Sequence, residues 1–254
     1  MSDAIWQPLH AELDAWAGAG RRVRLWLRDD DAVAPSPQLD ALAKLSERHD
    51  LPVLLAVIPF LAEPALVERL RSAPLLLPSQ HGAWHRNHAP QGEKKSEFGR
   101  HRPMEAVLAD IDAAKQRLGD LFGPALLPVF VPPWNRIDPT IAAKLPALGF
   151  AGLSCFRNFA LGPDGGPTLG NTDIDIMDWH GGRIGRPVAV LVEEIRAQLE
   201  QRRLSRSRDE AVLGLLLHHR DHDESAWAFL EGLLGLSVRH PAVAFGDPRV
   251  LFKA

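Results

Sequence analysis

The sequence predicts an α/β fold in one domain, with a parallel sheet that forms either an α/β barrel or an open, doubly wound layer. Short apolar runs alternate with amphipathic stretches along the chain, which is the pattern of strands joined by helices. The apolar runs are continuous, as in residues 53–58 (VLLAVI), and such runs are typical of parallel strands covered on both faces. Five polar clusters each follow a predicted strand. Because the strands of an α/β barrel all end on one face, where active sites form, these clusters favour the barrel.

The chain begins with a predicted amphipathic helix over residues 1–20. Its apolar residues recur at helical spacing: Ile5, Leu9, Leu13 and Trp16. No shift in composition marks a boundary further along. We therefore predict a single domain over residues 1–254, in which this helix precedes a barrel over residues 21–254.

Strands and helices alternate in the rest of the sequence. The predicted strands cover residues 23–27, 53–58, 75–77, 126–131, 150–153, 174–177, 212–217 and 243–245. The predicted helices cover residues 37–47, 63–70, 103–121, 139–148, 188–203 and 225–236, and Pro103 suits the first position of its helix. Long loops are predicted at residues 86–102 and 161–171.

Composition limits the classes of function. The 254 residues are 46% hydrophobic and 24% charged, as in a soluble globular protein. The formal net charge of −3 argues against a general nucleic-acid binder. The single cysteine, Cys155, cannot form an internal disulfide, and we expect it to be buried. There is no signal-peptide core and no apolar run long enough for a transmembrane segment, so we expect a cytoplasmic location.

Two of the polar clusters contain candidate metal ligands. Asp29, Asp30 and Asp31 follow the first strand, and three adjacent carboxylates repel one another unless a cation or a buried proton is present. A solvated turn is the alternative. Residues 81–88 contain three of the chain's 11 histidines, and imidazoles four residues apart can bind one metal ion.

A third cluster, residues 217–223, follows another buried strand. His218 and His219 point to opposite faces, so only one of them can face a pocket. Asp221 or Asp223 could orient a histidine and raise its pKa, which suits a general acid. The alternative is a polar strand end before a helix cap at Ser225. An Asp and two His leave open positions on a metal ion, and such a site performs metal-assisted hydrolysis.

Taken in order, these clusters resemble the motifs of the polysaccharide deacetylases, the NodB-homology group of carbohydrate esterase family 4. Asp30 and Asp31 resemble the paired aspartates of the first motif, and the resemblance implies a catalytic base and a metal ligand, respectively. A shift of one residue would give these roles to Asp29 and Asp30. His81 and His85 match the His-x-x-x-His motif and are implied to be metal ligands. His88 is a further ligand or substrate contact.

The third motif of the family, Arg-x-Pro-Tyr/Trp-Gly, is similar to residues 131–136 (VPPWNR). Val131 replaces the arginine that tunes the base, and Asn135 replaces the glycine. Arg28 or Arg136 could supply the missing cation.

The last two motifs resemble residues 175–179 (DIMDW) and Leu216-Leu217-His218. The resemblance implies that His218 is the general acid and that the strand carrying Asp178 and Trp179 lines the groove wall, with His222 in a supporting position. Trp134 and Trp179 could stack on sugar faces.

The resemblance implies a deformed (β/α)7 barrel and a metal-dependent hydrolase that removes N-acetyl groups from an amino sugar. The cofactor is a divalent metal ion, with zinc preferred over cobalt, iron or nickel. The expected substrate is an acetylated glycan, or its lipid-linked or nucleotide-linked precursor, in cell-surface (O-antigen-type) glycan biosynthesis. The alternatives are hydrolysis of another amide and a catalytically inactive glycan-binding barrel. The basic loop at 92–102 either contacts an anionic part of the substrate or is a solvated surface loop.

Overall fold

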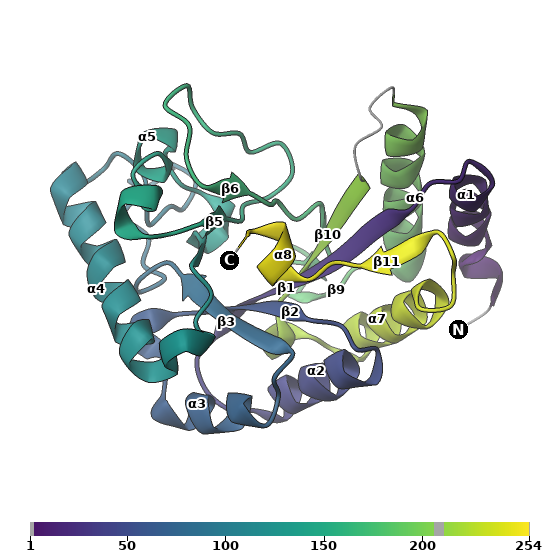
Figure 1. Ribbon diagram of the computed structural model, residues 1–254, viewed down its shortest axis with the longest axis horizontal. Coiled ribbons are helices and arrows are strands. Elements are labelled where there is room, and N and C mark those ends of the chain that lie inside the picture. The colour runs from purple at the N-terminus through teal and green to yellow at the C-terminus, as the bar shows by residue number, and fades with distance from the viewer. Residues whose placement is uncertain (1–2, 206–210, 254) are drawn as a thin grey trace.

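A curled parallel sheet forms the centre of the molecule, and helices cover its outer face (Figure 1). The computed structural model describes residues 3–205 and 211–253. The strand order is β6-β5-β4-β3-β2-β1-β10-β7, with β11 paired to β1, and each of these pairings is parallel. The strands are β1 (Val23–Ala32), β2 (Val53–Val57), β3 (Leu76–His81), β4 (Val129–Val131), β5 (Gly152–Leu153), β6 (Thr168–Leu169), β7 (Ile174–Asp175), β10 (Ala211–Leu217) and β11 (Val243–Phe245).

Most helices lie between strands in the chain, whereas α1 precedes the first strand and α8 follows the last. They are α1 (Gln7–Gly18), α2 (Pro37–Arg48), α3 (Pro64–Arg71), α4 (Met104–Phe122), α5 (Pro139–Ala142), α6 (Val188–Leu204), α7 (Glu224–Ser237) and α8 (Pro248–Leu251). The short 3-10 turns are η1 (Asp3–Ile5), η2 (Pro59–Leu61), η3 (Gly123–Ala125), η4 (Pro133–Asn135), η5 (Leu145–Leu148) and η6 (His219–Asp221). A separate antiparallel hairpin is formed by β8 (Met177–Asp178) and β9 (Ile184–Gly185). No helix in the described ranges combines the length and apolar character that a membrane crossing requires.

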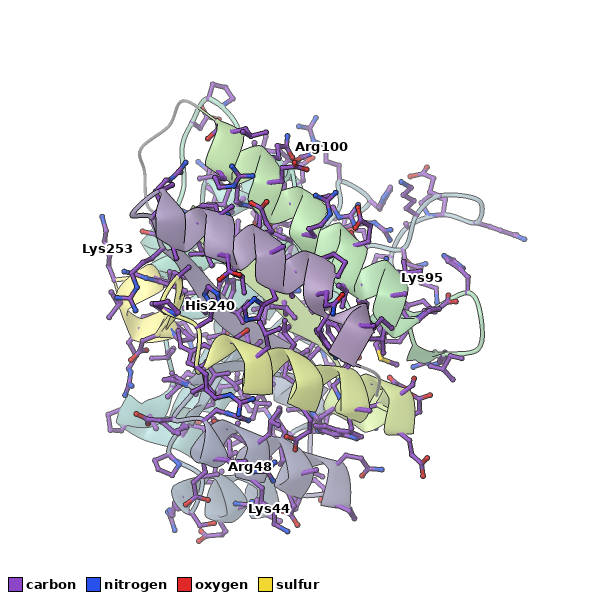
Figure 2. All side chains as sticks on the ribbon, turned by 90° about the vertical axis from the view of Figure 1, so that its right-hand side faces the viewer. Lys44, Arg48, Lys95, Arg100, His240 and Lys253 are labelled. Carbon is purple, nitrogen blue, oxygen red and sulfur yellow. The ribbon has the colours of Figure 1, made fainter. Side chains whose placement is uncertain are left out.

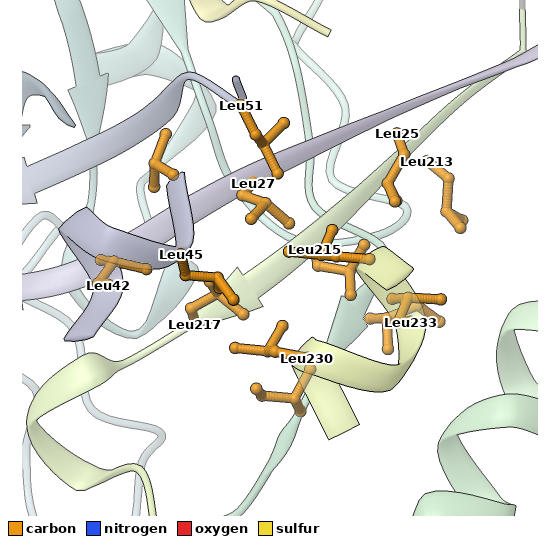
Figure 3. Close-up of a cluster of buried hydrophobic side chains, with 14 of the residues drawn as sticks. Leu25, Leu27, Leu42, Leu45, Leu51, Leu213, Leu215, Leu217, Leu230 and Leu233 are labelled. Carbon is orange, nitrogen blue, oxygen red and sulfur yellow. The ribbon is translucent and has the colours of Figure 1, made fainter. Parts of the chain in front are cut away.

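The sheet is buried on both faces, which explains the continuous apolar runs. On the outer face, leucines of β1 and β10 such as Leu27 and Leu217 pack against α2 and α7 (Figure 3). On the inner face, Trp26 packs against Phe252, the residue after α8, with their ring centroids 5.7 Å apart. Gly152 is also packed closely against this ring, since a Cβ at that position would lie 2.5 Å from it. The amino-terminal end of the barrel is therefore filled, and the strand carboxyl ends are left for a site.

Most predicted elements are present, with differences that have local causes. The predicted helix at 139–148 divides into α5 and η5, because Pro146 has no N–H to continue the α-helical hydrogen bonds. The predicted strand at 174–177 divides into β7 and β8, and β6 and β9 were not predicted. The N-terminal helix starts only at Gln7, and residues 1–2 of that prediction lie outside the described residues.

The first strand is longer than predicted. It continues to Ala32 and so includes the three aspartates, which were expected to follow it. Its pairing with β2 shifts register between Asp29 and Ala32, and Asp31 has a φ of 72°. A bulge of this kind changes the direction of a side chain at the end of a strand. Here it lets neighbouring aspartates point to different partners.

Candidate functional site

The inner side of β1 carries a buried ion pair between Arg28 and Asp30. Nε and Nη2 of the arginine donate to the two carboxylate oxygens of Asp30 at 2.9 and 3.0 Å. Nη1 donates to Oγ of Ser154 at 2.8 Å, and Nη2 also donates to Oδ1 of Asn135. The guanidinium is fully buried, and this bidentate geometry fixes the orientation of the carboxylate.

Arg28, and not Arg136, is thus the arginine that contacts Asp30. The side chain of Arg136 instead donates to the backbone carbonyl of Lys95 at 2.8 Å. Val131, which occupies the place of the family arginine, is buried among the apolar side chains inside the barrel.

Next to this pair, Asp31, His81 and His85 converge from β1 and from the loop that begins at the end of β3. Oδ1 of Asp31 lies 3.1 Å from Nε2 of His81 and 3.3 Å from Nε2 of His85. One ligand atom from each of the three residues lies within 4.8 Å of the others. The spacing fits a divalent ion held by two imidazoles and one carboxylate.

The hydrogen bonds around this group favour a cation. Nδ1 of His81 faces the carbonyl oxygen of Val131 at 3.1 Å and donates to it, so the lone pair of a neutral ring is on Nε2 and faces Asp31. Oδ1 of Asp31 is buried and has no hydrogen-bond partner among residues 3–205 and 211–253. Burial acts to lower the pKa of His81, but the carboxylates of Asp30 and Asp31 outweigh it and raise that pKa. Positive charge is therefore stabilised here, whether it comes from a proton or from a metal ion.

Backbone strain is concentrated at this site. Asp31, His85, Trp134 and Asn135 all have φ between 55° and 72°, the left-handed region that non-glycine residues rarely adopt. Such conformations cost on the order of 1 kcal/mol each and persist where surrounding contacts hold them. The ring of Trp134 packs against that of His85 with centroids 4.5 Å apart, which is one of these contacts.

Glu97 holds the histidine loop in place, a role that was not predicted from the sequence. Its carboxylate accepts the backbone N–H groups of Ala83 and Trp84 at 3.3 and 2.8 Å. Burial raises the pKa of this carboxyl, although the N–H donors act against the shift. Glu97 lies in the loop at 92–102, for which a solvated surface loop was one of the two expectations, but Ser96, Glu97 and Phe98 are buried. The one available signal was the apolar Phe98 within a run of polar residues.

On the β10 side, His218 is packed against Trp179. The two rings are nearly perpendicular, with centroids 4.5 Å apart, and Nε1 of Trp179 donates to Asp175 at 2.8 Å. Nδ1 of His218 is buried without a hydrogen-bond partner in the part of the chain that the structure describes. Asp178 is the last residue of β8, and its carboxylate accepts the backbone N–H groups of His180 and Gly181 in the β8–β9 turn.

Asp29 lies on the opposite face of β1 from Asp30. It accepts the backbone N–H of His219 at 2.8 Å, and its carboxylate also pairs with Nδ1 of that ring. His222 accepts the backbone N–H of His218 at 3.2 Å and packs against Trp227.

The expectation that Asp221 or Asp223 orients a histidine is wrong. Asp221 pairs with Arg183, and Asp223 is the N-cap of α7, where it accepts the N–H of Ala226. The cap is thus Asp223 rather than Ser225, whose hydroxyl donates to the Asp223 carboxylate. Strand alternation decides this outcome, because it turns His219 toward Asp29.

His88 lies outside the group formed by Asp31, His81 and His85. It is half-buried in the loop that follows, and its backbone N–H donates to the carbonyl of Ser96.

A second group, His10, Asp14 and His240, is less suited to a metal ion. His240 lies beside α1 (Figure 2), with Nε2 3.2 Å from Asp14, and His10 lies 3.0 Å from the same carboxylate. The N–H of Ala242 points at Nδ1 of His240, so Nδ1 is the acceptor and Nε2 carries the proton. This tautomer donates to Asp14 and leaves no lone pair on Nε2. In His81, by contrast, Nδ1 carries the proton and Nε2 keeps its lone pair.

Comparison with known proteins places this site in a recognised fold. No protein-family model matches the sequence, and no curated protein matches it. Among solved structures, a protein from Mycobacterium smegmatis assigned as a polysaccharide deacetylase matches with a TM-score of 0.66 at 14% identity, over 92% of this chain and 90% of its own. A family 4 carbohydrate esterase from Streptomyces lividans, in complex with acetate, gives 0.57 at 16% identity over 88% and 91%. The peptidoglycan N-acetylglucosamine deacetylase Bc1960 gives 0.59 at 14% identity over 95% and 97%.

At these identities the comparisons establish a shared fold. The resemblance to family 4 polysaccharide deacetylases that the five motifs predicted is confirmed at this level, and so is the deformed (β/α)7 barrel.

Proposed function

We propose that this protein is a metal-dependent hydrolase that removes the N-acetyl group from an amino sugar in a polysaccharide or its precursor. The observation that carries the proposal is the convergence of Asp31, His81 and His85 beside the buried Arg28–Asp30 pair. These groups lie at the carboxyl ends of the strands, where α/β barrels place their active sites.

The metal-binding role falls to Asp31, His81 and His85. Two imidazoles and a carboxylate are ligands that zinc accepts, and cobalt, iron and nickel bind similar sets. When bound, a divalent ion supplies a Lewis acid for the acetamide carbonyl and for a water molecule.

Asp30 is the general base in this proposal. Arg28 uses one N–H for each carboxylate oxygen, so each oxygen keeps a lone pair while the carboxylate is held in one orientation. Asp30 accepts a proton as the oxygen of water bonds to the acetyl carbon. Rigid positioning matters because proton transfer requires hydrogen-bond distance from the attacking water.

His218 is the general acid. The packing of Trp179 against its ring, and the hydrogen bond from Trp179 to Asp175, limit the orientations that the imidazole can adopt. As the carbon–nitrogen bond breaks, a proton from His218 goes to the departing nitrogen. The products are acetate and a free amino sugar, and the proton held by Asp30 restores the histidine through solvent.

The experiment is acetate release from N-acetylglucosamine oligosaccharides in the presence of zinc or cobalt. We expect Asp30→Asn and His218→Gln to lower kcat by about 100-fold or more, as loss of a general acid or base does. Asp112→Asn is a matched control, because that carboxylate lies on α4, where it accepts from Gln116 in an exposed contact. Metal-loaded protein that releases no acetate from these sugars would contradict the proposal.

Two alternatives make different predictions in the same assay. Release of acetate or ring opening from simple amides, but not from sugars, would indicate a hydrolase of another amide. Glycan binding without hydrolysis would indicate an inactive barrel, and this fold does include a protein described as a family 4 pseudoenzyme, matched with a TM-score of 0.60 at 12% identity. The cytoplasmic location and the O-antigen-type context stay predictions from the sequence.

A further inference from the structure

Two cations, Lys95 and Arg136, lie in the segments around Trp134, whose ring packs against the candidate ligand His85. Nζ of Lys95 lies 5.9 Å from the ring centroid of Trp134, and Trp134 packs against the ligand His85. Arg136 donates from Nη1 to the backbone carbonyl of Lys95, so the two positive side chains come from adjoining backbone. Neither has a carboxylate within ion-pair distance among the residues that the structure describes.

A third cation approaches from a different strand end. Arg220, in η6, donates from Nη1 to the backbone carbonyl of Asp31 at 3.2 Å, and the rest of its guanidinium is exposed. It too lacks a carboxylate partner in the described ranges.

The acidic groups near the site are already engaged. Asp30 pairs with Arg28, Asp31 faces the two histidines, and Asp221 pairs with Arg183. Arginines on the outer helices have carboxylate partners, as in Arg71 with Glu68 and Arg196 with Glu193. Among the described residues, Lys95, Arg136 and Arg220 therefore keep charges that no carboxylate pairs with, and such charges attract an anion.

We propose that the substrate carries an anionic group, a carboxylate or a phosphate, close to its acetamido group, and that Lys95 and Arg136 bind this anion. This inference rests on the proposed function and names its substrate class. Arginine and lysine form charge-assisted hydrogen bonds with both kinds of anion. The hydrogen bond from Arg136 to the Lys95 carbonyl joins the basic loop to the segment that carries Trp134, and the Lys95 ammonium lies over the Trp134 ring. Arg220 adds positive potential on the Asp31 side.

The test is calorimetric binding to the Asp30→Asn variant, which leaves the ligand intact. Three ligands are compared: a neutral N-acetylglucosamine tetrasaccharide, a tetrasaccharide that alternates glucuronic acid with N-acetylglucosamine, and UDP-N-acetylglucosamine. We expect at least one anionic ligand to bind about tenfold more tightly than the neutral one, a difference that charge-assisted contacts readily supply. The carboxylate and phosphate ligands identify which anion is recognised.

Lys95→Gln and Arg136→Gln, each combined with Asp30→Asn, should remove most of this preference. Lys94→Gln is the matched control, since it removes a charge from the adjacent residue of the same loop. Equal affinity for all three ligands would overturn the inference, and so would an equal loss of preference in the Lys94 variant.

Acetate release by the wild-type protein separates this inference from the proposed function. Hydrolysis of the neutral tetrasaccharide without any anionic preference in binding overturns the anion site and leaves the deacetylase intact. An anionic preference that depends on Lys95 and Arg136, without hydrolysis of any acetylated sugar, supports the anion site and overturns the deacetylase.

Discussion

Arg28 and Asp30, two residues apart on β1, form a buried bidentate ion pair inside the barrel. Alternation along a strand places residues i and i+2 on the same face, so a single segment supplies both charges. In the family motif that this sequence resembles, the arginine comes instead from the position that Val131 occupies here. In this protein the arginine beside Asp30 comes from the same strand, and Val131 lies on β4.

Replacing Arg28 should be costly. Arg28→Met leaves the Asp30 carboxylate buried without its partner, and breaking a buried pair in this way costs about 3–5 kcal/mol. Urea unfolding measures the loss. Arg136→Gln is the control, because its side chain bonds only a surface carbonyl, and it should change stability by less than about 0.5 kcal/mol. An Arg28→Met protein as stable as wild type would show that Asp30 does not depend on this cation.

Metal binding should depend on Asp31, His81 and His85, and not on the second His/Asp group beside α1. We expect titration with zinc to reach one ion per chain, and Asp31→Asn and His81→Gln to weaken binding by about tenfold or more. His240→Gln should leave the stoichiometry unchanged, since the tautomer of His240 directs its proton at Asp14. Loss of the bound ion in the His240 variant alone would place the site beside α1 instead.

Gly82 is required by the geometry of the histidine loop. Its φ is +59°, and a Cβ there would lie 2.6 Å from the ring of Pro133 and would also collide with the Glu97 carboxylate. Gly82→Ala should therefore displace the loop that carries His85 and weaken zinc binding as well as stability. Gly92→Ala offers a matched comparison, because Gly92 also has a positive φ but nothing lies within 4 Å of its Cβ position. That variant should lose only about 1 kcal/mol and retain full zinc affinity, measured by calorimetry.

Stability should fall in acid because of His222. Burial lowers the pKa of this imidazole from 6.5 to about 4. Between about pH 6.5 and pH 4, the His222 imidazole takes up a proton in the unfolded chain but stays neutral in the folded protein. The free energy of unfolding is therefore highest above about pH 6.5 and decreases as the pH falls toward 4. The effect amounts to roughly 3 kcal/mol at most. His222→Gln keeps an acceptor for the backbone N–H of His218. In this variant the free energy of unfolding, measured with urea, should change less with pH over the roughly three units between pH 7 and pH 4. A curve of unchanged slope in the variant would contradict this assignment.

Cys155 should be inert in the folded protein. Its side chain is fully buried, and burial raises the pKa of the thiol to about 12, so almost no thiolate is present near neutral pH. An aromatic disulfide reagent should label the thiol only after denaturation in guanidinium chloride. Rapid labelling of the native protein would show that the segment beside the Arg28 guanidinium opens readily.

Much of the fold follows from local patterns in the sequence. Apolar runs such as the one in β2 gave the strands, and prolines and glycines marked most of their ends. The bounds of short elements were less predictable, because two-residue strands such as β6 carry no periodic signal.

The site was only partly predictable. The spacing of His81 and His85 is a local signal, and the structure brings both to Asp31. The partner of His219 and the role of Glu97 depend on contacts that spacing does not encode. Asp29 and His219 are 190 residues apart in the sequence, and Ala83 and Glu97 are joined across a loop with no regular structure.

The sequence by itself therefore determined the layers, the strand order along the chain and the residue types available at the strand ends, because hydrophobic periodicity and turn residues act locally. Only the tertiary structure decided which charged side chains at the strand ends pair with one another. Asp29 rather than Asp221 holds His219, because β1 pairs with β10 and so places Asp29 beside the end of β10. The bulge in β1 separates the directions of the neighbouring aspartates.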